Sequence, residues 1–204
     1  GKKREMPGGA GNVASNVISL GGRAVLIGLA GADEAGETLR QALGSRQNVS
    51  DCLVTTSLRP TICKTRFIAS HQQVIRADEE SRLPLQDEEA EKLCRVFDEQ
   101  IGAAQVVILS DYGKGVCDRR VVRHVIDTCR ARGIAVFADP TDPDFRHYLG
   151  VTCIPPNAKE PAAASGLPTG THSEVEAAAR KGMAAAEASA LLATRSEKDI
   201  TLVP

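Results

Sequence analysis

The chain has 204 residues, of which 42% are hydrophobic and 25% charged, and this composition suits one α/β domain with a packed core. Its 25 basic and 26 acidic residues give a formal net charge of −1, so we expect no nucleic-acid or anionic-membrane partner, since both favour a basic surplus. No apolar run reaches the roughly 18 residues of a membrane span, and the polar first residues are unlike a signal peptide. The six cysteines are scattered without a Cys-x-x-Cys pair, which favours reduced thiols in a cytoplasmic protein.

A glycine-rich segment comes first. Residues 7–14 read Pro-Gly-Gly-Ala-Gly-Asn-Val-Ala, and Val13, Val17 and Leu20 have helical spacing. Glycine allows close approach to the backbone, and a helix start offers unpaired N–H groups to a polar ligand. The letters also match the dinucleotide fingerprint G-x-G-x-x-A, but residues 2–7 are too polar for the buried strand that this motif requires. Residues 7–14 are therefore interpreted either as a ligand site or as a structural turn.

The segment from Asp51 to Ala77 is rich in Thr, Val and Ile with alternating polarity. This pattern predicts two or three antiparallel strands, separated at 59–60 and 71–72, with one face toward solvent or a partner. A β-rich insertion beside an α/β core is a candidate lid or interface.

A helix is predicted over 87–101, because three acids suit the positive end of its dipole and one stripe is apolar. The stripe consists of Ala90, Leu93, Cys94, Phe97 and Ile101.

A βαβ unit follows. The apolar runs 106–109 and 134–138 predict buried strands, and a helix from Asp118 to Gly133 connects them. Such strands are parallel, with a right-handed connection. The helix has one apolar face, made of Val121, Val122, Val125, Ile126 and Cys129. Segments 151–154, 174–188 and 190–193 continue the alternation of strand and helix.

Two acids end the predicted strands of this unit. Asp111 follows the first strand and Asp139 the second, and ligands gather beyond the carboxyl ends of parallel strands. We therefore expect both carboxylates to face one crevice, with Lys114 nearby. The alternative is that each acid only caps the helix that follows it.

Three further polar residues come later in the chain. Asn157 and Glu160 could bind a metal-linked water or a phosphate oxygen. The alternative is that Asn157 caps a helix and Glu160 lies in its first turn. Arg195 suits a phosphate but is equally compatible with simple solvation. Ser110 has no His/Asp relay in the sequence pattern, so nucleophilic catalysis is not predicted.

Together these motifs resemble the ribokinase (PfkB) sugar-kinase family over nearly the whole chain. Residues 7–14, with 20–22 and 27–33, resemble its first signature, and Asn157 and Glu160 its Asn-x-x-Glu motif near Mg-ATP. Four segments resemble, more narrowly, the heptose 7-phosphate kinases of ADP-heptose synthesis: 61–66, 72–78, 109–115 and 194–197.

The resemblance implies an α/β fold, a ribokinase-like three-layer sandwich with a mainly parallel sheet and a small β-rich lid. In this view residues 1–204 are a partial kinase domain, and 51–77 form the lid, through which a homodimer is expected. The implied reaction is ATP-dependent phosphorylation of D-glycero-D-manno-heptose 7-phosphate at O1, with Mg²⁺, toward the lipopolysaccharide core. Phosphoryl transfer depends on positioning and charge neutralisation, which these residue types supply.

The resemblance also assigns residue roles. On the substrate side are Gly8, Gly9, Asn12, Lys64, Arg76, Asp111 and Lys114. On the nucleotide and Mg²⁺ side are Asp139, Asn157, Glu160 and Arg195, none of them as a direct metal ligand.

The chain also departs from the family pattern. The family's base, an Asp in a Gly-Ala-Gly-Asp motif that also forms the anion hole, and the opening strand with a sugar-binding Asp are not among these residues. Thr141 stands where heptose kinases commonly have Lys, and Asp199 where a glycine is expected. We therefore expect this segment alone to be nearly inactive. Another sugar or nucleoside kinase of the family, and a non-catalytic remnant that binds sugar phosphate or only dimerises, stay open as alternatives.

Overall fold

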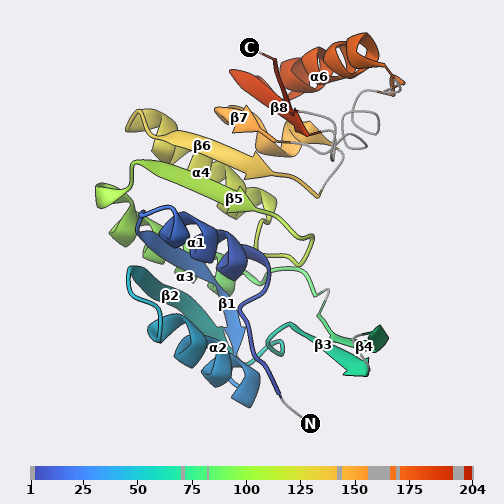
Figure 1. The fold of residues 1–204 in the computed structure, drawn as a ribbon. Coiled ribbons are helices and arrows are strands. Elements are labelled where there is room, and N and C mark those ends of the chain that lie inside the picture. Colours follow the sequence, from blue (N-terminus) through green and yellow to red (C-terminus); the bar gives the residue numbers. More distant parts are fainter. Residues whose placement is uncertain are drawn as a thin grey trace. The chain divides into compact units, whose positions relative to one another are not determined.

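A computed structural model describes residues 3–69, 72–81, 83–141, 144–155, 166–168, 171–194 and 200–203 (Figure 1). The chain divides into two compact units. The first unit contains Gly1–Phe97 and Lys114–Val116, and the second contains Asp98–Gly113 and Cys117–Pro204. Each unit has strands and helices of its own.

The first unit begins with a helix and a parallel strand pair. Its elements are α1 (Gly9–Ser19), β1 (Ala24–Gly31), α2 (Glu34–Gly44) and β2 (Val49–Thr56). The two strands pair in parallel over their whole length, and both helices lie against them (Figure 1). The Arg40 side chain on α2 donates to both carboxylate oxygens of Asp51 at 3.0 and 2.9 Å, which ties the helix to β2. The helix predicted from the spacing of Val13, Val17 and Leu20 is confirmed, and Leu20 caps its C-terminal end, where it is 89% exposed.

The prediction that Asp51–Ala77 forms only antiparallel strands is wrong at its beginning. Residues up to Thr56 belong to β2, which is parallel to β1. Alternating polarity reports how a strand is buried but not which strand it pairs with, so the pattern could not separate this strand from the next two. Those two, β3 (Cys63–Ala69) and β4 (Gln72–Glu79), do form an antiparallel pair.

Helix α3 (Asp87–Gln100), followed by a short 3₁₀ turn, η1 (Ile101–Ala103), confirms the helix predicted after the hairpin. Its stripe is buried at Ala90, Leu93, Phe97 and Ile101 and half-buried at Cys94. Three acids, Asp87, Glu88 and Glu89, occupy the first turn, where the helix dipole favours negative charge.

The second unit is built on a five-stranded sheet of order β5-β6-β7-β8-β9. Its elements are β5 (Val106–Ser110), α4 (Arg119–Ala131), β6 (Ala135–Asp139), η2 (Phe145–Tyr148), β7 (Cys153–Ile154), α6 (His172–Ala186), β8 (Ala190–Thr194) and β9 (Ile200–Val203). Every neighbouring pair is parallel except β8 and β9. The predicted βαβ unit is confirmed: Asp118 caps α4 by accepting a hydrogen bond from the Arg120 N–H, and the predicted apolar face of α4 is buried.

Within the described part of the chain, none of the helices combines the length and the apolar composition that crossing a membrane requires.

Candidate active site

Asp111 and Asp139 lie at the same edge of the second unit's sheet, as predicted. Ser110, the last residue of β5, is in register with Asp139, the last residue of β6. The Asp111 N–H donates to the Asp139 carbonyl at 3.1 Å, which extends the pairing one residue past the strand end. The structure therefore brings both acids to one edge, and a crevice between their side chains stays a prediction.

The Asp111 carboxylate is held at both oxygens. Oδ1 accepts from the Gly113 N–H at 2.7 Å, and Oδ2 accepts from the Tyr148 hydroxyl at 2.5 Å. Gly113 has a φ of +64°, in the left-handed region that side chains disfavour, so glycine allows the tight turn. Thr141 donates its hydroxyl to the Asp111 carbonyl at 2.6 Å. Thr141, which departs from the family pattern, thus holds the backbone of Asp111 in place.

Tyr148 was not predicted as part of the site. Its side chain is fully buried, and the His147 ring lies edge-on to it at 4.8 Å between ring centres. The His147 Nε2 atom is in turn 2.9 Å from the Cys117 carbonyl. No local spacing could have identified Tyr148, because its partner Asp111 is 37 residues away in the sequence.

The surroundings of this sheet edge shift the pKa values of the Cys117 thiol and the Asp139 carboxyl. Desolvation, helped by the charge of Asp111, raises the pKa of the half-buried Cys117 to about 12, which favours the protonated thiol at neutral pH. Partial desolvation, and then the nearby Asp111 charge, raise the pKa of Asp139. The Ser110 hydroxyl beside them is buried and has no hydrogen-bond partner among the described residues.

Mg²⁺ binds oxygen ligands, commonly one or two carboxylates together with phosphate oxygens. Asp111 directly follows β5 and Asp139 ends the adjacent strand β6, and the pKa of Asp139 is raised first by desolvation and then by the charge of Asp111. Two carboxylates at one sheet edge are the kind of oxygen ligand that a magnesium ion arriving with a nucleotide accepts. A complete protein cage is not present: the described residues contain no cluster of three or more His, Cys, Asp or Glu side chains that could hold a metal.

In the first unit, two of the predicted substrate residues converge on one acid. Lys64 lies 3.1 Å from Glu80 Oε1, and Lys114 contacts Glu80 Oε2. Hydrogen bonds from Lys114 and then Lys64 lower the pKa of Glu80. Arg76 does not join this group, since it pairs with Asp78 on its own strand at 3.0 Å. Sequence analysis predicted Lys64 and Lys114 as site residues but not Glu80, which both lysines contact.

The glycine-rich turn places its three predicted residues in one helical turn. Gly8 caps α1, Gly9 begins it, and the Gly8 carbonyl accepts from the Asn12 N–H at 3.3 Å. Gly8 and Asn12 are exposed. No strand precedes α1 among residues 3–8, in agreement with the argument against a dinucleotide site.

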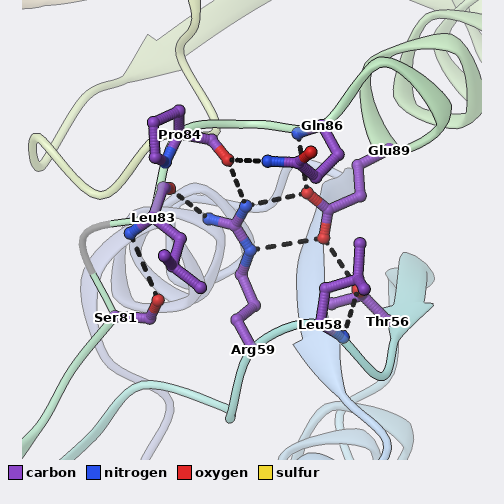
Figure 2. A network of polar contacts seen from close by, with 8 residues as sticks. All are labelled: Thr56, Leu58, Arg59, Ser81, Leu83, Pro84, Gln86 and Glu89. Carbon is purple, nitrogen blue, oxygen red and sulfur yellow. Dashed lines mark hydrogen bonds and ion pairs between the residues drawn. The ribbon is translucent and has the colours of Figure 1, made fainter.

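A buried ion pair that the sequence patterns did not predict lies where the chain enters and leaves the β3–β4 hairpin (Figure 2). Arg59 and Glu89 have side chains 5% and 4% exposed, with Nη2 and Oε2 2.8 Å apart. Arg59 also donates to the Leu83 and Pro84 carbonyls, each at 2.9 Å. The pair therefore joins the segment that enters the hairpin, the segment that leaves it, and α3.

Glu89 is further satisfied by the Thr56 hydroxyl at 2.7 Å and the Gln86 N–H at 3.0 Å. Burial acts to raise the pKa of Glu89, but these hydrogen bonds and Arg59 outweigh it and the pKa is lowered. A Cβ on Gly115 would lie 3.3 Å from the Arg59 guanidinium, and the φ of Gly115 is +90°. Glycine thus lets the loop that carries Lys114 pass close to this pair.

Asn157, Glu160 and Arg195, predicted for the nucleotide side, lie outside the described residues.

Comparison with solved structures defines the class of fold. The chain is similar to the tetrameric inhibited form of phosphofructokinase-2 from Escherichia coli, with a TM-score of 0.76, 21% identity, and coverage of 97% of this chain and 65% of that one. It is also similar to Arabidopsis thaliana ribokinase complexed with ribose and ATP, with a TM-score of 0.67, 20% identity, and coverage of 94% and 61%. The expected ribokinase-like α/β fold is confirmed.

The family follows from sequence. The model of the pfkB family carbohydrate kinases matches residues 2–203, and the chain belongs to this family. It is 60% identical over 203 residues to the bifunctional protein HldE of Gluconacetobacter diazotrophicus, covering 100% of this chain and 42% of that protein. For the HldE of Granulibacter bethesdensis the identity is 48% over 198 residues, covering 97% and 41%. The chain thus spans about two-fifths of the length of the curated relatives it matches.

Proposed function

We propose that this chain supplies the kinase reaction of a heptose-phosphorylating protein. ATP would phosphorylate O1 of D-glycero-D-manno-heptose 7-phosphate to give the 1,7-bisphosphate, in the cytoplasm, where ATP is available. Membership of the carbohydrate kinase family supports a sugar kinase. The choice of a phosphorylated sugar rests on one observation: the Lys64 and Lys114 ammonium groups converge on Glu80.

In this proposal each described residue performs one physical task. Asp111, fixed by Gly113 and Tyr148, accepts a hydrogen bond from a sugar hydroxyl, and the N-terminal turn of α1 binds other hydroxyls through Gly8, Gly9 and Asn12. Positioning of this kind supplies much of the rate enhancement in phosphoryl transfer.

The remaining proposed roles concern charge. Lys64, Arg76 and Lys114 bind the substrate phosphate. Asp139 faces the nucleotide side, which Asn157, Glu160 and Arg195 complete. Mg²⁺ bound with ATP would neutralise negative charge on the transferring phosphoryl group.

A substrate comparison tests the proposal. With the full-length natural protein, we expect ATP consumption on heptose 7-phosphate with a kcat/KM at least about a hundredfold above that on unphosphorylated heptose, ribose, fructose or adenosine, because charged hydrogen bonds to phosphate are strong. Preference for one of the other sugars would instead indicate a different kinase of the family. Calorimetry that detects heptose 7-phosphate binding without turnover would indicate a binding protein.

We also propose that the β3–β4 hairpin pairs with a second copy of the chain. Phe67 lies directly opposite Ile75, and these side chains are 53% and 57% exposed. Ile68 and Val74 beside them are 67% and 69% exposed. A two-stranded hairpin is marginal alone, and large exposed apolar side chains on it favour an interaction with another surface.

Light scattering on a sizing column tests this pairing. The natural sequence is expected to elute as a dimer and the variant F67E/I75E as a monomer, because carboxylates cannot be buried unpaired in an interface. Leu20→Glu, which changes a residue that is 89% exposed past the end of α1, is the matched control and should stay dimeric. An unchanged mass for F67E/I75E would contradict pairing through the hairpin.

A further inference from the structure

One carboxylate in the first unit is shared by two lysines from separate segments. Lys64 comes from β3, Lys114 from the loop 114–116, and Glu80 directly follows β4. The Glu80 and Lys114 side chains are only 17% and 20% exposed, and that of Lys64 is 42% exposed. Each carboxylate oxygen of Glu80 contacts a different lysine, so the acid sits between the two positive charges.

The hairpin adds further positive charge beside this cluster. In the antiparallel register Lys64 lies opposite Asp78, and Arg66 lies directly opposite Arg76. Like charges in directly opposite positions are destabilising, and side chains two residues apart share one face of a strand. This face, together with Lys114, therefore carries four cations, whereas its described acids are Asp78 and Glu80.

The charge surplus fits a phosphate monoester. Four cations and two acids leave a surplus of two positive charges, and a phosphate monoester carries about −1.5 to −2 at neutral pH. An ammonium group has three donors and no fixed geometry, so each lysine can exchange one oxygen partner for another at little steric cost. Glu80, however, is itself an anion and competes with any anionic ligand for the same two donors.

We propose that Glu80 is a competing counter-ion that sets the charge selectivity of the phosphate site: it holds Lys64 and Lys114 in the ligand-free protein and yields them only to a phosphate dianion. A neutral sugar cannot displace a carboxylate from two ammonium groups, whereas a dianion with several acceptor oxygens can. This inference rests on the proposed function, because it takes the two lysines as the site of the substrate phosphate.

The test measures binding of inorganic phosphate and of heptose 7-phosphate by calorimetry on the full-length protein. Glu80→Gln keeps the size of the side chain and removes its charge, so both ligands are expected to bind about tenfold more tightly. Lys64→Gln and Lys114→Gln are expected to weaken both by a similar factor. The matched control is Glu88→Gln, which removes an exposed acid that pairs with Lys92 on α3, and it should change neither affinity.

The outcomes separate this inference from the proposed function. Weaker or unchanged phosphate binding by Glu80→Gln would overturn the competing role. If Glu80 only oriented the lysines, its removal would not strengthen phosphate binding. If Glu80→Gln does not fold, Glu80→Ser provides the same comparison without a carboxylate. A preference for another phosphorylated sugar, with tighter inorganic phosphate binding by Glu80→Gln, would overturn the heptose assignment and leave the role of Glu80 intact.

Discussion

Replacing Arg59 with methionine is expected to lower the free energy of unfolding of the first unit by about 3–5 kcal/mol, because it leaves the Glu89 charge buried without its cation. The two side chains are 5% and 4% exposed, so water cannot take over the lost contacts. The Leu83 and Pro84 carbonyls lose their donors in the same variant. Urea unfolding followed by circular dichroism measures the change.

Two further variants distinguish a buried charge from simple loss of packing. The double variant R59M/E89L is expected to recover part of the lost stability, because it removes both charges together. Lys92→Met breaks an ion pair whose side chains are 45% and 73% exposed, and its effect should stay below about 1 kcal/mol. The interpretation fails if R59M behaves like K92M, or if the double variant is less stable than R59M.

Replacing Asp111 with asparagine is expected to reduce kcat/KM by about a hundredfold or more in the full-length protein, because the proposed sugar contact loses a charged acceptor. Asp127→Asn is the matched control, since Asp127 is an exposed acid on α4 that pairs with Arg123. The measurement is a coupled assay of ADP formation with heptose 7-phosphate. Activity of D111N near that of D127N would remove Asp111 from the proposed site.

Tyr148→Phe belongs to the same experiment and addresses positioning. We expect kcat/KM to fall about tenfold, since the tyrosine hydroxyl donates to one oxygen of Asp111 and would position that carboxylate. A purely structural role would lower the unfolding midpoint and leave kcat/KM unchanged wherever the protein is folded. The double variant D111N/Y148F should be no worse than D111N alone, because the positioned carboxylate is already absent.

The second unit was the more predictable part of the fold. Continuous apolar runs mark β5 and β6, and Asp118 and Gly133 bound the helix between them, so local patterns sufficed. In the first unit, β1 and α2 were not predicted as elements. Strand β1 reads AVLIGLAG, with two glycines, and α2 buries only Gly36 and Leu43. The pairing of β1 with β2 is a non-local property that local alternation does not encode.

The candidate site shows the same division. Asp111 and Asp139 were predictable because each directly ends a recognisable strand, and parallel strands end at one edge. Tyr148, Glu80 and Arg59 were not, since each acts on a partner 30 or more residues away. Their roles depend on tertiary contacts, and single-sequence patterns carry little information about these.

The acid pair at the ends of β5 and β6 has a consequence for the durability of the protein. Because the pKa of Asp139 is raised in the folded chain, ionisation at neutral pH works against folding, and this penalty fades as acidification protonates the carboxyl in both states. A neutral residue at position 139 would remove this penalty, and it would also remove a negative charge from the proposed nucleotide side of the site. Under the proposed function, selection for stability and selection for turnover would therefore favour different residues at the end of β6.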